Sequence, residues 1–262
     1  MPSPYKIRAD ITRTISARIE AYNKTPRGDS YNKHYAKFIQ VRLAGVRNCG
    51  LAAWLKTAES RSAIRSLLEE FGMDARKSQL APATIFDMNI SQIPDIANIE
   101  WLSRFQLSEE SLSKSGGSST VAEQIGKLFD FCADRGRFSE SGGFVIGTKV
   151  AHCVLPEVIP MIDISHIGIS LYNVPRKEYL PPGDVWRRYI GYEPRGKPNP
   201  SPNGAGRNSW KSDQILCAIG FYTRIYRDWL AFDEGNNLEK FLALDRSNGA
   251  TGIPRLLDKV LW

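Results

Sequence analysis

Residues 142–166 read GGFVIGTKVAHCVLPEVIPMIDISH, a glycine-rich turn followed by an apolar segment that holds one lysine and leads to one aspartate. Lys149 stands near the start of a predicted short helix, and Asp163 follows the two prolines of this segment. An unpaired ammonium group is costly to bury, so a lysine in an apolar run must extend to water, be paired or have a function. We interpret Lys149 as a nucleophile and Asp163 as its electrostatic partner.

The rest of the chain shows helical periodicity. Isoleucines recur every four residues from Ile7 to Ile19, which predicts an N-terminal helix with one apolar stripe. No segment shows the alternating pattern of a β-strand. The fold class is therefore predicted to be all-α. Further helices are predicted at 33–46, 49–57, 60–71, 85–90, 99–105, 119–133, 164–174, 184–189 and 210–232, with two short helices at the end of the chain.

Polar segments are predicted to separate these helices. TPRGDS (25–30) is expected to break the first helix, and SKSGGSST (113–120) is expected to be a loop. A longer connector is predicted at 193–209, which is rich in proline, glycine and asparagine. Thr120 and Glu123 have the spacing of a capping box, which predicts the start of the helix that follows.

Length and charge restrict the class of protein. A chain of 262 residues allows one large domain or two small ones. We expect a single helical domain over 1–262; the alternative is two helical subdomains, about 1–82 with the C-terminal helices and about 83–192, that flank a binding cleft. The net charge is +7, and residues 1–82 hold 15 basic against 7 acidic residues. A positive excess favours a polyanionic partner such as nucleic acid.

The sequence offers no pattern for a metal site, a membrane span or a secretion signal. Its four cysteines have no CxxC spacing and it has three histidines, so neither a zinc site nor a disulfide framework is predicted. No run approaches the roughly 18 apolar residues of a membrane span, and the N-terminus lacks the apolar core of a signal peptide. We expect a cytoplasmic protein without metal or organic cofactor. The cysteines have apolar neighbours and are expected to be buried free thiols: Cys49, Cys132, Cys153 and Cys217.

The segment GTKVAHCV around Lys149 closely resembles the helix-hairpin-helix DNA glycosylases, in particular the 8-oxoguanine DNA glycosylases. In that family a glycine hairpin precedes GTKVADCI, whose lysine is the nucleophile, and a PVDVH-type segment supplies the catalytic aspartate. The resemblance gives these two roles to Lys149 and Asp163. SWKSDQILCAIGF (209–221) is similar to a late helix of the family that carries a base-reading glutamine, which makes Gln214 the candidate for base binding.

The resemblance implies a multi-helix DNA glycosylase fold and an enzyme, expected to be a monomer, that acts on duplex DNA with a damaged or modified base. 8-Oxoguanine is the default substrate, and another modified base, such as one in invading DNA, stays open. Such an enzyme must take the target nucleotide out of the helix. Attack by the Lys149 amine on C1′ would give a Schiff base and permit strand cleavage; apolar surroundings favour the neutral amine that this reaction needs. Asp163 would stabilise the charge that develops as the base leaves.

The turn before Lys149 is a candidate DNA contact. Backbone N–H groups at the start of a helix can bind a phosphate. Gly143, Gly147 and Thr148 are therefore predicted to lie against the DNA backbone, and His166 is predicted to contact a phosphate. The family's hairpin usually reads LPGVG, whereas this chain has GGFVIG, and Ser165 stands where the family has a histidine.

Other interpretations stay open. Lys149 can be a surface lysine at the start of a helix, and Gln214 an exposed helical residue. Trp210, Phe221 and Tyr222 are more typical of a core than of a base-stacking site. For the whole protein, the alternatives are a catalytically inactive DNA-binding module of the same fold and a helical protein-interaction domain.

Overall fold

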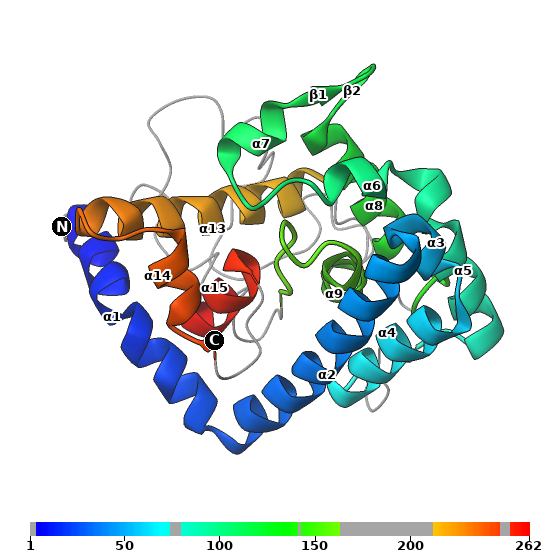
Figure 1. Ribbon diagram of the computed structural model, residues 1–262, viewed down its shortest axis with the longest axis horizontal. Coiled ribbons are helices and arrows are strands. Elements are labelled where there is room, and N and C mark those ends of the chain that lie inside the picture. Colours follow the sequence, from blue (N-terminus) through cyan, green and yellow to red (C-terminus); the bar gives the residue numbers. More distant parts are fainter. Residues whose placement is uncertain (1–3, 74–79, 141–142, 163–211, 247–251) are drawn as a thin grey trace, which may run out of the picture.

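The isoleucine stripe at the N-terminus forms a long helix, α1 (Pro4–Lys24), in which Ile15 and Ile19 are buried. The computed structural model describes residues 4–73, 80–140, 143–162, 212–246 and 252–262. These parts of the chain are mostly helical, which confirms the prediction of an all-α fold class (Figure 1).

The helices after α1 are joined by short connections over most of the described chain. Thr120 and Glu123 form the predicted capping box at the start of α8. The predicted helices at 164–174 and 184–189 and the connector at 193–209 lie outside the described residues. The bounds of the helices are α2 (Pro26–Cys49), α3 (Leu51–Leu55), α4 (Ala58–Glu70), α5 (Ala83–Ile96), α6 (Ile99–Leu102), α7 (Glu109–Ser113), α8 (Val121–Ala133), α9 (Phe144–Val154), α13 (Ser212–Phe232), α14 (Leu238–Ala243) and α15 (Ile253–Leu261).

The break predicted at TPRGDS (25–30) is confined to one residue. Only Thr25 lies between α1 and α2, and Pro26 is the first residue of α2. The Thr25 side chain accepts a hydrogen bond from the N–H of Gly28 at 2.9 Å, and so caps α2. The prediction of a longer break is wrong because proline is well tolerated at the first position of a helix, where its missing N–H needs no partner.

The segment predicted as a loop at 113–120 contains a small hairpin. Strand β1 (Ser115–Gly116) pairs antiparallel with β2 (Ser119–Thr120). Gly117, in the turn between them, has a φ of 65°. The loop prediction is wrong here because a two-residue turn with glycine at positive φ closes a hairpin even without apolar alternation in the strands.

Three long helices frame the molecule in Figure 1. Helices α1 and α2 meet at the lower corner, and α13 crosses above them. α13 packs against both α1 and α8. Within this frame, α15 lies beside α1, and α9 packs on α8 and α4. The C-terminal helix and the helix that carries Lys149 therefore both lie at the centre of the molecule.

Helix α9 is a core helix. Val150, Ala151 and Val154 are completely buried. A Cβ added to Gly147 would lie 2.7 Å from the Cβ of Ala133 on α8, so glycine is needed for the close approach of these two helices. At the other end of α9, the buried Arg42 on α2 donates to the carbonyl oxygen of Val154 at 2.9 Å. These contacts fix α9 against α8 and α2.

The buried apolar side chains form one continuous cluster that extends from α1 to α15. Residues of both predicted subdomains contribute to it, and the division into subdomains stays a prediction. Cys132 and Cys153 are buried thiols, as expected, and burial raises the pKa of Cys153 to about 12. The prediction is wrong for Cys49, which is exposed because it is the last residue of α2. The side chain of Cys217 lies outside the described residues.

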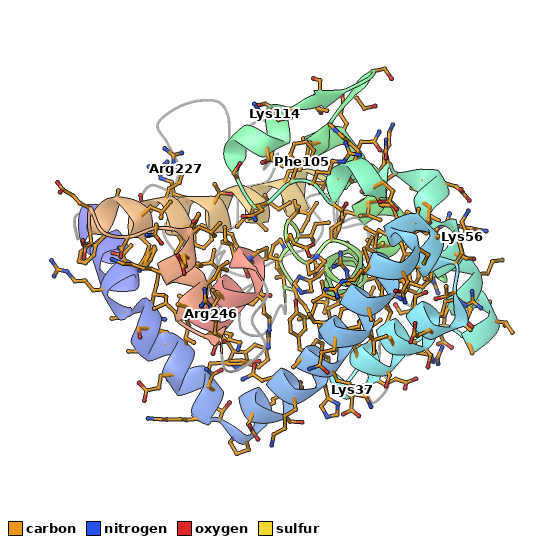
Figure 2. All side chains as sticks on the ribbon, in the orientation of Figure 1. Lys37, Lys56, Phe105, Lys114, Arg227 and Arg246 are labelled. Atoms are coloured by element: carbon orange, nitrogen blue, oxygen red, sulfur yellow. The ribbon has the colours of Figure 1, made fainter. Side chains whose placement is uncertain are left out.

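The exposed basic side chains are distributed over several sides of the molecule. Lys37, Lys56, Lys114 and Arg227, labelled in Figure 2, lie at the bottom, right, top and left of that view. They lie on or directly after different helices, so the positive excess is not gathered on one helix. None of the described helices is both long and apolar enough to cross a membrane.

Candidate active site

Lys149 lies on α9 with only 6% of its surface exposed. Its Nζ is 3.5 Å from the Sδ of Met73 and 5.6 Å from the centroid of the Phe71 ring. The side chain is thus almost completely withdrawn from water. The structure therefore excludes the interpretation of Lys149 as a solvated surface lysine.

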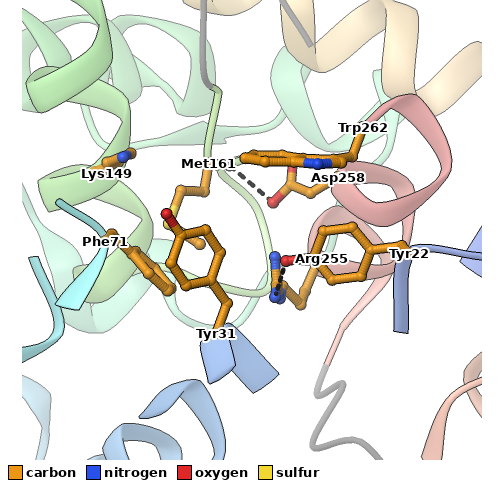
Figure 3. Close-up of a pocket in the computed structure, with 8 residues that line it drawn as sticks. All are labelled: Tyr22, Tyr31, Phe71, Lys149, Met161, Arg255, Asp258 and Trp262. Atoms are coloured by element: carbon orange, nitrogen blue, oxygen red, sulfur yellow. Dashed lines mark hydrogen bonds between the residues drawn. The ribbon is translucent and has the colours of Figure 1, made fainter. Parts of the chain in front are cut away.

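Lys149 faces a small pocket with aromatic walls (Figure 3). The volume of the pocket is about 20 Å³. This is room for about one water molecule. The pocket is assembled from α1, α2, α9, α15 and the segments that follow α4 and α9. Its lining residues are Tyr22, Tyr31, Phe71, Lys149, Met161, Arg255, Asp258 and Trp262.

Arg27, an exposed residue, contacts the partly exposed rings of this pocket. Its guanidinium lies 5.3 Å from the centroid of the Tyr31 ring and 5.5 Å from that of the Trp262 ring. Its Nε donates to the hydroxyl of Tyr31 at 2.7 Å. The two rings meet edge to face with their centroids 6.1 Å apart. The outer wall of the pocket is thus two aromatic rings held by one cation.

Asp258 on α15 supplies a buried carboxyl group to the pocket. It accepts hydrogen bonds from the Tyr222 hydroxyl at 2.7 Å and from the backbone N–H of Met161 at 3.1 Å. Burial raises the pKa of this carboxyl to about 7, although the nearby Arg255 and both hydrogen bonds act to lower it. Burial is thus the largest influence on this carboxyl group, and it opposes ionisation.

Thr148, the neighbour of Lys149, anchors the segment that leads to Asp163. The Thr148 side chain is completely buried, and its hydroxyl accepts the backbone N–H of Ile162 at 3.2 Å. The same hydroxyl lies 3.3 Å from the carbonyl oxygen of Ile162. In this arrangement Thr148 positions protein backbone. Asp163 itself is the next residue in the chain and lies outside the described residues.

Replacing Thr148 by valine is expected to lower the free energy of unfolding by about 1–3 kcal/mol. Valine has nearly the same shape but leaves the buried N–H of Ile162 without its acceptor. Urea unfolding measures the change. Thr148→Ser is the control, because it keeps the hydroxyl and loses only a methyl group. Equal losses in the two variants would show that the methyl packing, and not the hydrogen bond, holds this segment.

His152 is a neutral, structural histidine. Its Nδ1 lies 2.6 Å from the carbonyl oxygen of Ile159, which can only accept, so Nδ1 carries the proton. Its Nε2 then accepts from the hydroxyl of Tyr35, 2.9 Å away. Burial lowers the pKa of His152 to about 3, and the Ile159 hydrogen bond opposes this shift. The histidine joins α2, α9 and the segment after α9.

The stability contributed by His152 is expected to be lost in acid. Its folded pKa is depressed to about 3 from 6.5, so the unfolded chain takes up a proton that the folded protein does not. The advantage of the wild type over His152→Gln should therefore shrink by about 1.4 kcal/mol per pH unit below the unfolded value. Urea unfolding of both proteins from about pH 7 to about pH 4 tests this. A constant difference would mean that the imidazole is not held neutral.

A buried polar network holds α15 to α1 and α2. Lys259 pairs with Asp245 and also donates to Asn23 Oδ1 at 3.3 Å. Asn23 accepts from Asn32 at 2.8 Å, and Asn32 accepts from the guanidinium of Arg255 at 3.3 Å. Burial lowers the pKa of Lys259 to about 8, and Arg255 adds to this shift. The helix that carries Asp258 is thereby fixed by charged contacts inside the core.

The other predicted site residues are not brought together by the described structure. Gly143 precedes α9 with a φ of 109°, and its N–H donates to the carbonyl oxygen of Ala133 at 2.7 Å, so this donor is already used. Gly147 faces α8 rather than a ligand. Gln214 lies on α13, but its side chain is outside the described residues, as is His166. Phe221 and Tyr222 are buried, as the core interpretation expects.

Sequence reasoning missed Asp258 and Trp262. The last helix reads IPRLLDKVL, and Arg255, Asp258 and Lys259 share one face at helical spacing. Such a face is usually solvated. Here every residue of α15 is buried, including these three. The sequence of this helix shows a charged face opposite a strongly apolar face. That pattern predicts the helix, but it does not predict that other helices cover the charged face.

The described chain is mostly helical. Its consecutive helices α8 and α9 pack against each other, and α9 presents a nearly buried lysine to an aromatic pocket. No group of three or more potential metal-ligating side chains occurs among the described residues. No family model, curated protein or solved structure matches the chain.

Proposed function

We propose that this protein is a DNA glycosylase with an associated lyase activity, and that Lys149 is its nucleophile. The observation that carries the proposal is the Lys149 amine at a small pocket walled by aromatic rings. Aromatic faces stack on nucleobases of any sequence. Poorly solvating surroundings disfavour an ammonium relative to a neutral amine. Excision of a flipped base by an amine needs both conditions.

The reaction begins with attack of Lys149 Nζ on C1′ of the flipped nucleotide. The bond from C1′ to the base nitrogen breaks, and its electron pair leaves with the base, which takes up a proton. Loss of a proton from the attacking nitrogen and opening of the sugar ring give a Schiff base. β-Elimination then breaks the bond to the 3′ phosphate. Asp163, in the role that the sequence resemblance gives it, stabilises the positive charge on the sugar.

The anchoring of Ile162 supports this pairing of Lys149 with Asp163. Ile162 is hydrogen-bonded to Thr148, which precedes Lys149 on α9. Asp163 follows Ile162 directly, and consecutive Cα atoms are about 3.8 Å apart. The segment from which Asp163 extends is therefore tied to the helix of the nucleophile.

The pocket must widen to admit a base. Its volume of about 20 Å³ is far below that of a purine or pyrimidine. Tyr31 and Trp262 are the partly exposed rings of its wall, and their displacement would open it. Arg27, which stacks on both rings, is then free to contact a phosphate beside the flipped nucleotide. 8-Oxoguanine is the first base to test because of the resemblance in sequence.

Borohydride trapping tests the proposal. The protein is incubated with a duplex that contains one abasic site, and borohydride then reduces any Schiff base to a stable adduct. We expect a covalent protein–DNA complex whose modified peptide contains Lys149. Lys259, the other buried lysine named above, serves as an internal comparison in the peptide map. DNA binding without an adduct would favour the inactive DNA-binding module, and absence of salt-dependent DNA binding would reject both.

A further inference from the structure

The pocket beside Lys149 contains a polar group whose hydrogen-bonding capacity is not used up. Arg255, on the same helix as Asp258, donates from one terminal nitrogen to the Tyr22 hydroxyl at 3.2 Å and to Asn32 Oδ1 at 3.3 Å. Its Nε–H is buried and has no acceptor among the described residues. A buried donor without an acceptor is costly, and such groups call for a ligand or water.

Asp258 has unused capacity to accept hydrogen bonds. Each of its oxygens accepts one hydrogen bond, from Tyr222 and from Met161. An ionised carboxylate offers about four acceptor positions, so positions remain for a ligand. Asp258 and Arg255 stand one helical turn apart on α15, and both line the pocket with the aromatic rings. A donor and an acceptor thus lie together between flat apolar walls.

We infer that Asp258 and Arg255 form a recognition pair that hydrogen-bonds the polar edge of a flat heterocycle held among the pocket rings. The matching ligand edge has an N–H donor next to an oxygen or nitrogen acceptor, as on the edge of a nucleobase. Resting on the proposed glycosylase function, the inference makes this pair the base-reading group. Lys149 attacks the sugar, whereas Asp258 accepts an N–H of the base and Arg255 donates to the neighbouring acceptor.

Burial disfavours the ionised, accepting form of Asp258, and the charges and hydrogen-bond donors around it oppose that effect. Arg255 and Lys259 on its own helix are cationic neighbours, Tyr222 on α13 donates to it, and Lys149 on α9 lines the opposite part of the pocket. Tyr22 on α1 engages Arg255 rather than Asp258. Residues on several elements therefore hold Asp258 and Arg255 in place, so the two side chains have this geometry before a ligand binds.

Asp258→Asn tests the inference, because asparagine keeps the shape and replaces one acceptor by a donor. Base release is measured on duplexes that carry a single 8-oxoguanine, hypoxanthine, uracil or 3-methyladenine. Borohydride trapping is measured separately on an abasic duplex, which has no base to read. We expect base release to fall about 10- to 100-fold, with trapping on the abasic duplex nearly unchanged. Asp95→Asn, an exposed site on α5, is the matched control.

Each alternative result has a definite meaning. Equal loss of base release and abasic trapping in Asp258→Asn would make Asp258 a structural carboxylate and overturn the inference. Abasic trapping by the wild type without release of any of the four bases would also overturn it. Absence of wild-type trapping on the abasic duplex would instead reject the proposed function, and the inference with it.

Discussion

Lys149→Gln should lose covalent trapping on abasic DNA by at least about 1,000-fold, the scale on which removal of a nucleophile affects an enzyme. Glutamine has a similar length and apolar stem but an amide that does not attack C1′. Lys149 is nearly buried next to Phe71 and Met73, so the variant keeps most of the packing of the side chain. Band shifts on denaturing gels after borohydride treatment measure the adduct, and thermal unfolding confirms that the variant is folded.

Lys127→Gln is the matched control for this experiment. Lys127 is an exposed lysine on α8, the helix that packs against α9. It should trap DNA as well as the wild type does. An adduct that persists in Lys149→Gln but disappears when another lysine is replaced would assign the nucleophile elsewhere. The pocket would then serve binding alone.

Local features of this fold could be predicted from the sequence because they depend on neighbouring residues. The capping box of Thr120 and Glu123 is satisfied within one helical turn. The apolar surroundings of Lys149 also follow from its own helix, in which Val150 and Val154 are buried. The wrong prediction at Pro26 also has a local origin. A proline can mark the end of one helix or the beginning of the next, and the sequence pattern alone allows both.

The pocket could not be predicted because its walls come from distant parts of the chain. Tyr22 on α1, Tyr31 on α2 and Trp262 at the C-terminus meet only after the helices pack. The same holds for the role of Thr148. A threonine in a helix start suggests a phosphate contact, whereas here its hydroxyl satisfies the backbone of Ile162, fourteen residues further on. Buried hydrogen-bond partners of this kind are determined by tertiary packing.

Asp245→Ala should lower the free energy of unfolding by about 3–5 kcal/mol. Asp245 is the buried carboxylate that pairs with Lys259, and both side chains are almost completely inaccessible. Its removal leaves the Lys259 ammonium in the core without the charge that balances it. Urea unfolding at neutral pH measures the loss, and Arg246→Ala, at an exposed neighbouring position, should change it by no more than about 0.5 kcal/mol.

The double variant Asp245→Ala, Lys259→Met separates charge from packing. Removing both charges takes away the buried ammonium as well as its partner, so most of the lost stability should return. A double variant as unstable as Asp245→Ala would show that the loss comes from contacts of Asp245 other than its charge. The double variant keeps Lys149 and the pocket residues Asp258 and Trp262, so it should trap abasic DNA as the wild type does. Loss of trapping in a double variant with restored stability would show that Asp245 or Lys259 contributes to the reaction as well as to the fold.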